Sequence, residues 1–146
     1  KGEFLKLSHI EQMAVVAEIL NQYCHYTIIA NSYGAYLVLC VLAQSELQLN
    51  NVFLHSPVTG STNLQGTYFR PAGAKSLEDA IENCAFAGQI RNLAVVVGVE
   101  DIQCDPDRCG LMAAALKGKF AALSNQGHQI SPHLLEKLTD EFLRTI

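Results

Sequence analysis

A serine, an aspartate and a histidine stand out in this sequence because their types and order suit one kind of chemistry. Ser32, Asp101 and His128 follow one another in that order, separated by 69 residues and then by 27. In such a set the imidazole accepts the hydroxyl proton and later returns one to a leaving group, while the carboxylate fixes the imidazole tautomer and stabilises its charged form. The three residues are therefore candidates for nucleophile, orienting acid and general acid–base.

The residues around Ser32 indicate a sharp turn from a strand into a helix. Positions 30–34 read Ala-Asn-Ser-Tyr-Gly, with a small residue two positions before the serine and another two positions after it. Such a turn crowds its flanking residues and exposes the serine oxygen near a helix N-terminus, whose amide groups favour developing negative charge. Taken alone, the pentapeptide also fits an ordinary helix N-cap.

Asp101 and His128 each come just after a predicted strand. Sites in open parallel sheets form beyond the carboxyl ends of strands, so we expect both side chains and Ser32 at one edge. His128 by itself also fits an ordinary turn residue. Three nearby acids are alternatives to Asp101, and one of them, before a proline, has the signature of a helix cap: Glu100, Asp107 and the cap-like Asp105.

Strands and helices alternate along the chain. Short apolar, β-rich runs predict strands at 26–30, 51–55, 92–98 and 119–124. Helices are predicted at about 10–20, 33–44, 76–86 and 105–117 and from 132 onward, the first with an apolar face that includes Ile10 and a Ser8–Glu11 capping box. The segment 57–75 is expected to be a polar loop. Apolar strands separated by helices predict an α/β fold with a four-stranded parallel sheet and helices on both faces.

Composition narrows the classes of protein to which the chain can belong. Its 146 residues, 49% of them hydrophobic, predict a single domain over 1–146. The net charge of −4 argues against a nucleic-acid partner. No apolar run reaches the roughly 18 residues of a transmembrane helix, and the first eight residues carry no signal-peptide core, so we expect no membrane partner. Residue 1 is lysine, so the start was trimmed or the chain begins inside a longer protein.

The cysteines indicate a reducing compartment. Five of them, an odd number, are spread through apolar segments, which is typical of buried thiols in a cytoplasmic protein rather than of a disulfide framework: Cys24, Cys40, Cys84, Cys104 and Cys109. The spacing between Cys104 and Cys109 is not that of a common zinc pair, and no second pair follows. We therefore expect no metal and no cofactor.

From residue 26 onward the chain resembles the C-terminal half of an α/β-hydrolase. Positions 30–34 are similar to the nucleophile elbow of that family, with alanine in place of its usual first glycine. Gly98-x-x-Asp101 matches the acid motif after the family's seventh strand, and Gly127-His128 matches its histidine motif after the eighth. The resemblance implies a partial α/β-hydrolase fold and serine-dependent acyl hydrolysis, of the esterase or thioesterase sort, on a small-molecule ester-type substrate.

The chain departs from the family before the elbow. The family usually has four earlier strands, and a loop after the third supplies its second oxyanion amide, whereas only 25 residues precede Tyr26 here. The resemblance leaves the backbone amide of Tyr33 as one oxyanion donor, and losing the other typically costs about 10²–10³ in rate. Segment 57–75 takes the position of the family's cap, where Arg70 would hold a substrate carboxylate or remain a solvated loop residue.

The missing strands also predict an assembly. The strand at 26–30 would keep one apolar edge without a partner, and such an edge invites association. We therefore predict a homodimer with this edge in or near the contact. The alternative to an enzyme is a non-catalytic remnant of an α/β-hydrolase that dimerises or docks to a partner. A flavodoxin-like phosphate-binding domain is disfavoured because no glycine-rich loop follows a strand in the required form.

Overall fold

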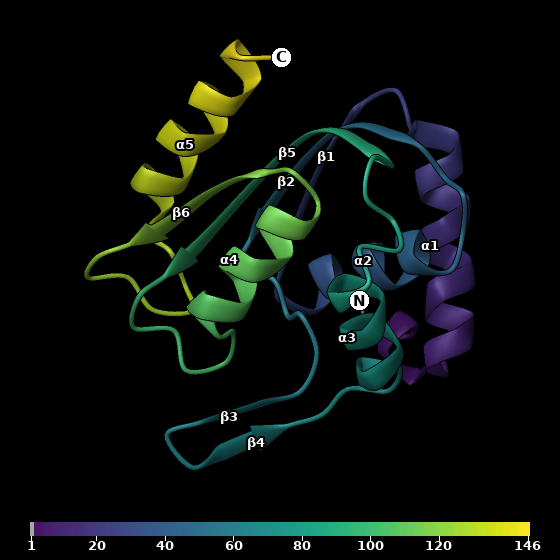
Figure 1. The fold of residues 1–146 in the computed structure, drawn as a ribbon, viewed down its shortest axis with the longest axis horizontal. Coiled ribbons are helices and arrows are strands. Elements are labelled where there is room, and N and C mark those ends of the chain that lie inside the picture. Colours follow the sequence, from purple (N-terminus) through teal and green to yellow (C-terminus); the bar gives the residue numbers. More distant parts are fainter. Residues whose placement is uncertain (1) are drawn as a thin grey trace.

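A parallel sheet of four strands forms the centre of residues 2–146, the part of the chain that the computed structural model describes (Figure 1). The strand order is β1-β2-β5-β6, so each strand lies beside the next large strand in the chain. All three pairings are parallel. The strands are β1 (Thr27–Asn31), β2 (Leu49–His55), β5 (Ile90–Gly98) and β6 (Lys119–Leu123). The predicted four-stranded α/β sheet is thus confirmed, with strand bounds within two residues of those expected.

Two helices begin at side-chain caps that the sequence predicts. Ser8 and Glu11 form the predicted capping box at the start of the first helix, and Asp105 accepts hydrogen bonds from two backbone amides at the start of the fourth. A short 3-10 helix, η1 (Phe4–Lys6), precedes them. The α-helices are α1 (His9–Tyr23), α2 (Ser32–Ala43), α3 (Ala74–Glu82), α4 (Pro106–Ala115) and α5 (Pro132–Arg144).

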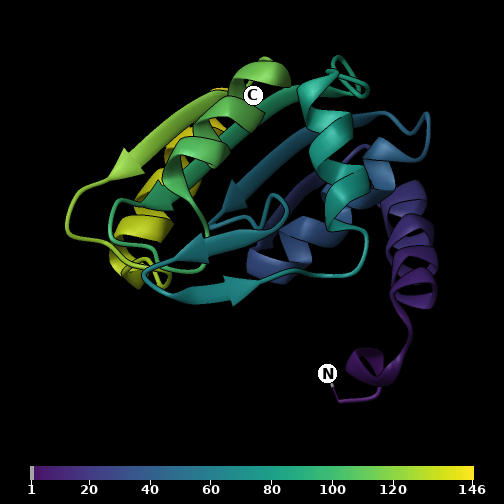
Figure 2. The same ribbon diagram turned by 60° about the horizontal axis from the view of Figure 1, so that its bottom comes forward.

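Two apolar layers cover the two faces of the sheet. On one face α2 and α4 pack against the side chains that alternate along β2 and β5, such as Val52, Leu54 and Val95. On the other face Phe53 and Val96 pack against α5, where the rings of Phe53 and Phe142 lie 5.6 Å apart. Figure 2 shows α3 and α4 in front of the sheet and α5 behind it. The helices therefore cover both faces, as the apolar strands predicted.

The segment 57–75 contains a hairpin that the sequence did not predict. Strands β3 (Thr62–Leu64) and β4 (Thr67–Phe69) pair antiparallel across Gln65 and Gly66, which both have positive φ. Paired positive φ values are typical of the tight turn that matches strand twist, but Asn-Gly rather than Gln-Gly is its usual signal. The hairpin stands beside the edge where the sheet strands end (Figures 1 and 2).

The outer edge of β1 is open. Within residues 2–146, β1 pairs only with β2, and its Ile29 is 51% exposed. A shallow groove of about 560 Å³ runs along this edge between α1 and α2. Ile10 of α1, expected to face the core, is also exposed, because the face of the helix that packs inward carries Gln12, Val16 and Leu20 instead. No helix in the described chain has the length and apolar character needed to cross a membrane.

Candidate active site

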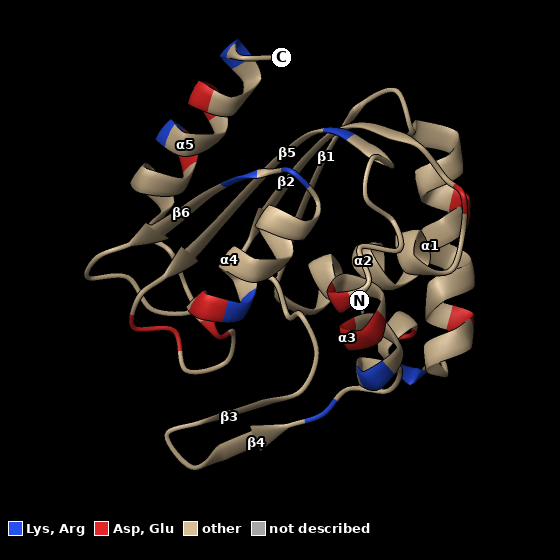
Figure 3. Ribbon diagram, in the orientation of Figure 1, with Lys and Arg blue, Asp and Glu red and all other residues tan. Residues whose placement is uncertain are grey.

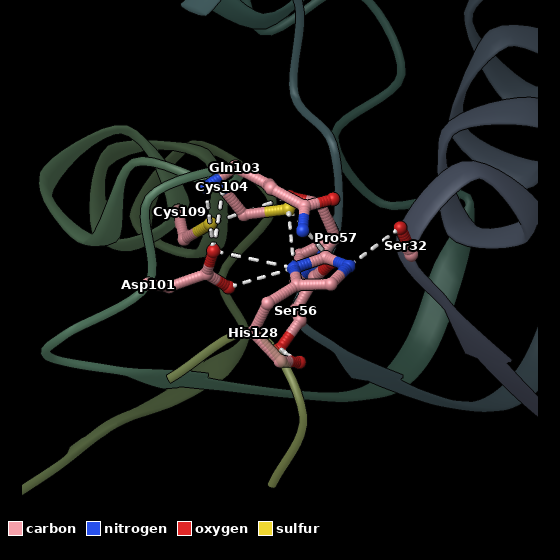
Figure 4. A network of polar contacts seen from close by, with 8 residues as sticks. All are labelled: Ser32, Ser56, Pro57, Asp101, Gln103, Cys104, Cys109 and His128. Carbon is pink, nitrogen blue, oxygen red and sulfur yellow. Dashed lines mark hydrogen bonds and ion pairs between the residues drawn. The ribbon is translucent and has the colours of Figure 1, made fainter. Parts of the chain in front are cut away.

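The three predicted side chains meet in one chain of hydrogen bonds at the carboxyl edge of the sheet (Figure 4). The imidazole Nε2 of His128 lies 2.9 Å from Ser32 Oγ. On the other side of the ring, Nδ1 lies 3.0 Å from Asp101 Oδ2 and 3.2 Å from Oδ1. These distances allow a proton to pass from the hydroxyl to the ring while the carboxylate holds the other nitrogen.

Ser32 occupies a strained turn. It follows Asn31, the last residue of β1, and begins α2 with φ of 47°, a left-handed value that is uncommon for a residue other than glycine. Its carbonyl accepts a hydrogen bond from the Val58 amide at 3.3 Å, which ties the turn to the end of β2. Backbone strain of this kind costs of order 1–3 kcal/mol and clusters at functional sites.

Tyr33 follows in the first turn of α2, where amide groups have no acceptor within the helix. Its backbone N–H is therefore placed to donate to an anion beside Ser32, as the resemblance implied. The Tyr33 hydroxyl points elsewhere and donates to Gln12 Oε1 on α1 at 2.9 Å. That contact anchors the first turn of α2 to the outer helix.

Asp101 is fixed by backbone amides. The residue is only 4% exposed, and its Oδ1 accepts hydrogen bonds from the amides of Gln103 at 2.8 Å and Cys104 at 2.9 Å. Of the alternative acids, Asp105 caps α4, while Glu100 and Asp107 lie exposed at the surface. Asp101 is therefore the acid of this group that contacts the histidine.

The loop that carries His128 is packed closely against the end of β5. A Cβ atom at Gly98 would lie 2.2 Å from the Gln126 carbonyl oxygen and 2.4 Å from that of Gly127, so only glycine fits there. The Glu100 amide donates to the Gln126 carbonyl at 2.9 Å. The glycine of the Gly-x-x-Asp pattern, Gly98, thus allows the loop that carries His128 to pack directly against the end of β5.

Two further residues of this site were missed by sequence reasoning. Ser56, with φ of 44° at the end of β2, donates its hydroxyl to the His128 carbonyl at 2.9 Å. The Cys104 thiol donates to the Ser56 carbonyl at 2.9 Å, and its sulfur lies 3.7 Å from His128 Nδ1. Burial raises the pKa of the Cys104 thiol, with the Asp101 charge adding to the effect, so the thiol stays protonated near neutral pH. Ser56, like Asp101, follows the end of a strand of the parallel sheet, so the same rule could have identified it from the sequence.

The glycine at the elbow is a different case. A Cβ at Gly34 would meet nothing within 4 Å, so the crowding expected from its spacing is absent within the described chain. The reason is the open side of β1, because Gly34 lines the groove along that edge. No contact within the described chain therefore requires a small residue at position 34.

Charge is unevenly distributed around the site. Acidic residues gather from the turn after β5 into the first turn of α4, which also carries Arg108, and the other Lys and Arg are spread over the molecule (Figure 3). Arg70 is exposed just after the end of β4, and its role in binding a carboxylate stays a prediction. Burial, with a smaller effect from His128, lowers the pKa of His55, so this neighbour at the end of β2 adds no positive charge at neutral pH.

Known structures share the fold of this chain, although no family model and no curated protein sequence matches it. A predicted CIB-like hydrolase from Thermoplasma acidophilum superposes with a TM-score of 0.69 at 14% identity, over 97% of this chain and 62% of that one. The monoacylglycerol lipase of Paleococcus ferrophilus superposes with a TM-score of 0.67 at 15% identity, over 94% of this chain and 74% of the lipase. SOBER1 of Arabidopsis thaliana superposes with a TM-score of 0.63 at 18% identity, over 94% of this chain and 64% of SOBER1.

These likenesses define the class of fold. The chain has the α/β-hydrolase fold, as the elbow, acid and histidine motifs implied. It does so in partial form, because it spans about 62% of the Thermoplasma hydrolase and 74% of the lipase. The four strands, the elbow turn and the loops that follow β5 and β6 are the parts present.

Proposed function

We propose that this protein is a serine-dependent acyl hydrolase that cleaves small-molecule esters or thioesters. The observation that carries the proposal is the unbroken hydrogen-bonded chain from Ser32 Oγ through the His128 ring to the Asp101 carboxylate. The strained turn at Ser32 supports it, because a hydroxyl at a strand-to-helix turn is exposed to a substrate. The structural neighbours named as a lipase and a hydrolase are consistent with the same reaction class.

Each residue has a distinct part in the proposed reaction. Ser32 Oγ attacks the acyl carbonyl while His128 Nε2 accepts its proton, and Asp101 stabilises the imidazolium that results. The C–O or C–S bond to the leaving group then breaks, and the imidazolium donates its proton to that group. A water molecule, activated by the same imidazole, releases the acid from Ser32.

The oxyanion of the tetrahedral intermediate needs hydrogen-bond donors. The Tyr33 amide supplies one within this chain, at the positive end of the α2 dipole. A site with one donor instead of two is expected to be slower by about 10²–10³. We therefore expect weak turnover from the isolated chain and stronger turnover where a partner completes the site.

Covalent labelling tests the proposal directly. A fluorophosphonate probe reacts with an activated serine, so the chain should be labelled at Ser32, and Ser32→Ala should abolish labelling and lower ester hydrolysis by about three orders of magnitude or more. Ser124→Ala, at an exposed serine after β6, is the matched control and should keep both activities. Equal labelling of the Ser32→Ala and parent proteins would refute the hydrolase.

A non-catalytic module is the second candidate, and the open edge of β1 is the observation that favours it. Backbone groups along this edge have no partner strand within residues 2–146, and apolar side chains lie beside them, including Tyr26, 66% exposed. We propose that a second copy of the chain covers this edge in a homodimer, with or without catalysis. Light scattering decides the assembly, and a clean monomer at micromolar concentration would refute it.

We further propose that residues 1–146 act as one domain in the cytoplasm. Five free cysteines, three of them buried, support a reducing compartment. Fractionation of cells that produce the tagged protein tests this, because recovery in the secreted fraction would contradict it.

A further inference from the structure

A thiol beside the histidine has no part in the proposed hydrolysis. Asp101 carboxylate oxygen, Cys104 Sγ and His128 Nδ1 all lie within 4.8 Å of one another. Figure 4 shows the sulfur and the carboxylate on the same side of the imidazole, away from Ser32. Oxygen, sulfur and nitrogen donors gathered at this distance are the ligand types that zinc and cadmium take in proteins.

Two of the three separations are close to those of a tetrahedral site. With metal–sulfur and metal–nitrogen bonds of about 2.3 and 2.0–2.1 Å, the two ligand atoms lie about 3.6 Å apart. Cys104 Sγ and His128 Nδ1 are 3.7 Å apart. The Nδ1 to Asp101 Oδ2 distance of 3.0 Å is shorter than the about 3.3 Å that such a site needs, a difference of a few tenths of an ångström.

Charge and the surrounding contacts also suit a divalent cation. A carboxylate and a thiolate together neutralise a charge of +2, which a buried position requires. Asp101 Oδ1 is already held by the amides of Gln103 and Cys104, so those bonds orient the carboxylate while Oδ2 faces the ring. The Asp101 side chain is fully buried and Cys104 is 1% exposed, whereas the His128 side chain is 18% exposed, so the imidazole is the part of the cluster that reaches the surface.

We propose that Asp101, Cys104 and His128 bind a thiophilic divalent cation, with Zn²⁺ as the model, and that the bound ion switches off Ser32. Binding displaces one proton, that of the Cys104 thiol, and forms bonds to sulfur, Nδ1 and a carboxylate oxygen. The remaining ring proton then sits on Nε2, which donates to Ser32 Oγ instead of accepting from it. The first part of the proposal, cation binding (the binding half), is argued from the geometry. The second part, inactivation of Ser32 (the switching half), rests on the proposed hydrolase function.

Cadmium titration tests the binding half without any assay of activity. The probe is Cd²⁺, whose thiolate complex has an ultraviolet charge-transfer band, added to protein in which the accessible Cys24 and Cys84 are replaced by serine. We expect one equivalent to bind, with Zn²⁺ competing for the same site. Cys104→Ser should remove the band and weaken binding by about 10²-fold or more, since even outer-shell losses cost 10–100-fold.

Two variants keep this test decisive. Cys109→Ser alters another buried thiol outside the cluster and should keep the band, while His128→Gln should weaken Cd²⁺ binding although the thiol remains. An unchanged titration in both Cys104→Ser and His128→Gln would overturn the site. So would the absence of a stoichiometric band in the parent protein.

Fluorophosphonate labelling then tests the switching half. One equivalent of Zn²⁺ should abolish labelling of Ser32, a chelator should restore it, and the labelling rate of Cys104→Ser should be unaffected by the same Zn²⁺ concentration. Full labelling of a zinc-loaded parent protein would overturn the switch. If the metal-free parent is never labelled, the proposed function fails and the switch with it, while the cadmium titration still decides the metal site.

Discussion

The acid and the histidine of this site are carried by two loops that are hydrogen-bonded to each other, the closed half of the site, whereas the serine is carried by an open strand edge. β5 is paired on both sides and mostly buried, and although β6 is the other edge strand of the sheet, the loops after β5 and β6 are joined by backbone hydrogen bonds. β1 is paired on one side only, and its exposed residues line a groove. The chain thus holds the acid and the histidine together by its own contacts and leaves Ser32, the proposed nucleophile, beside an edge that a partner can influence.

The largest effect should come from changing the charge in the closed half. Asp101→Asn is expected to lower the rate of Ser32 labelling by about 10⁴-fold, because the amide holds His128 in the tautomer that cannot accept the serine proton. The rate of fluorophosphonate labelling is the measurement. Asp107→Asn, at an exposed acid in the first turn of α4, is the control and should be neutral. Equal rates in the two variants would contradict the role of Asp101.

A pair of glycines contrasts the two halves directly. Gly98→Ala places a Cβ against the Gln126 and Gly127 carbonyls, so it should destabilise the fold by about 1–3 kcal/mol and slow labelling by about 10²-fold as His128 moves. Gly34→Ala fills open space in α2 and should keep both properties. Denaturant unfolding and labelling rates measure both. A neutral Gly98→Ala would show that the histidine loop adapts freely.

A charged side chain on β1 tests whether two copies of the chain associate through the open edge of this strand. Ile29→Lys places an ammonium group at a half-exposed position of β1, where it should prevent association of two edges and change the stability of the monomer by no more than about 0.5 kcal/mol. Light scattering should give a dimer for the parent chain and a monomer for the variant. A dimer that persists would place the contact elsewhere, for instance on the exposed surface of α5.

The smallest effect concerns the ion pair between Glu78 and Arg108, which lies beside the segment that leads into the hairpin. Burial alone would raise the pKa of Glu78, but the Ser61 amide and Arg108 outweigh it and hold that pKa below its ordinary 4.5. A carboxyl with a lowered pKa in the folded state stabilises it above about pH 4.5, and this contribution is lost as pH falls through the lowered value.

Glu78→Gln should therefore reduce the loss of stability on acidification below pH 4.5. Urea unfolding at a series of pH values measures it. Glu82→Gln, one turn later on α3, is the control. If the free energy of unfolding fell in parallel with pH in the parent and in Glu78→Gln, the stabilising role of the Glu78 carboxylate would be contradicted.

The sequence allowed the sheet and the ordered trio to be predicted because both depend on local signals. Apolar runs mark β2 and β5, and strand ends place Ser32, Asp101 and His128 at one edge. The hairpin was missed because three-residue strands joined by Gln-Gly carry little signal. Cys104 was missed because its neighbour in space, His128, is 24 residues away, and no pattern in the chain links a thiol to that ring.

Strand order has a consequence for how the chain comes to fold. Each sheet strand pairs with the next one along the chain, so the sheet can grow from the N-terminus during synthesis, one crossover at a time. Ser32 and His128 are 96 residues apart, and the histidine follows the last strand. A nascent chain therefore holds Ser32, the proposed nucleophile, without its proposed base until β6 has docked, so the site forms only when the last of the four strands is in place.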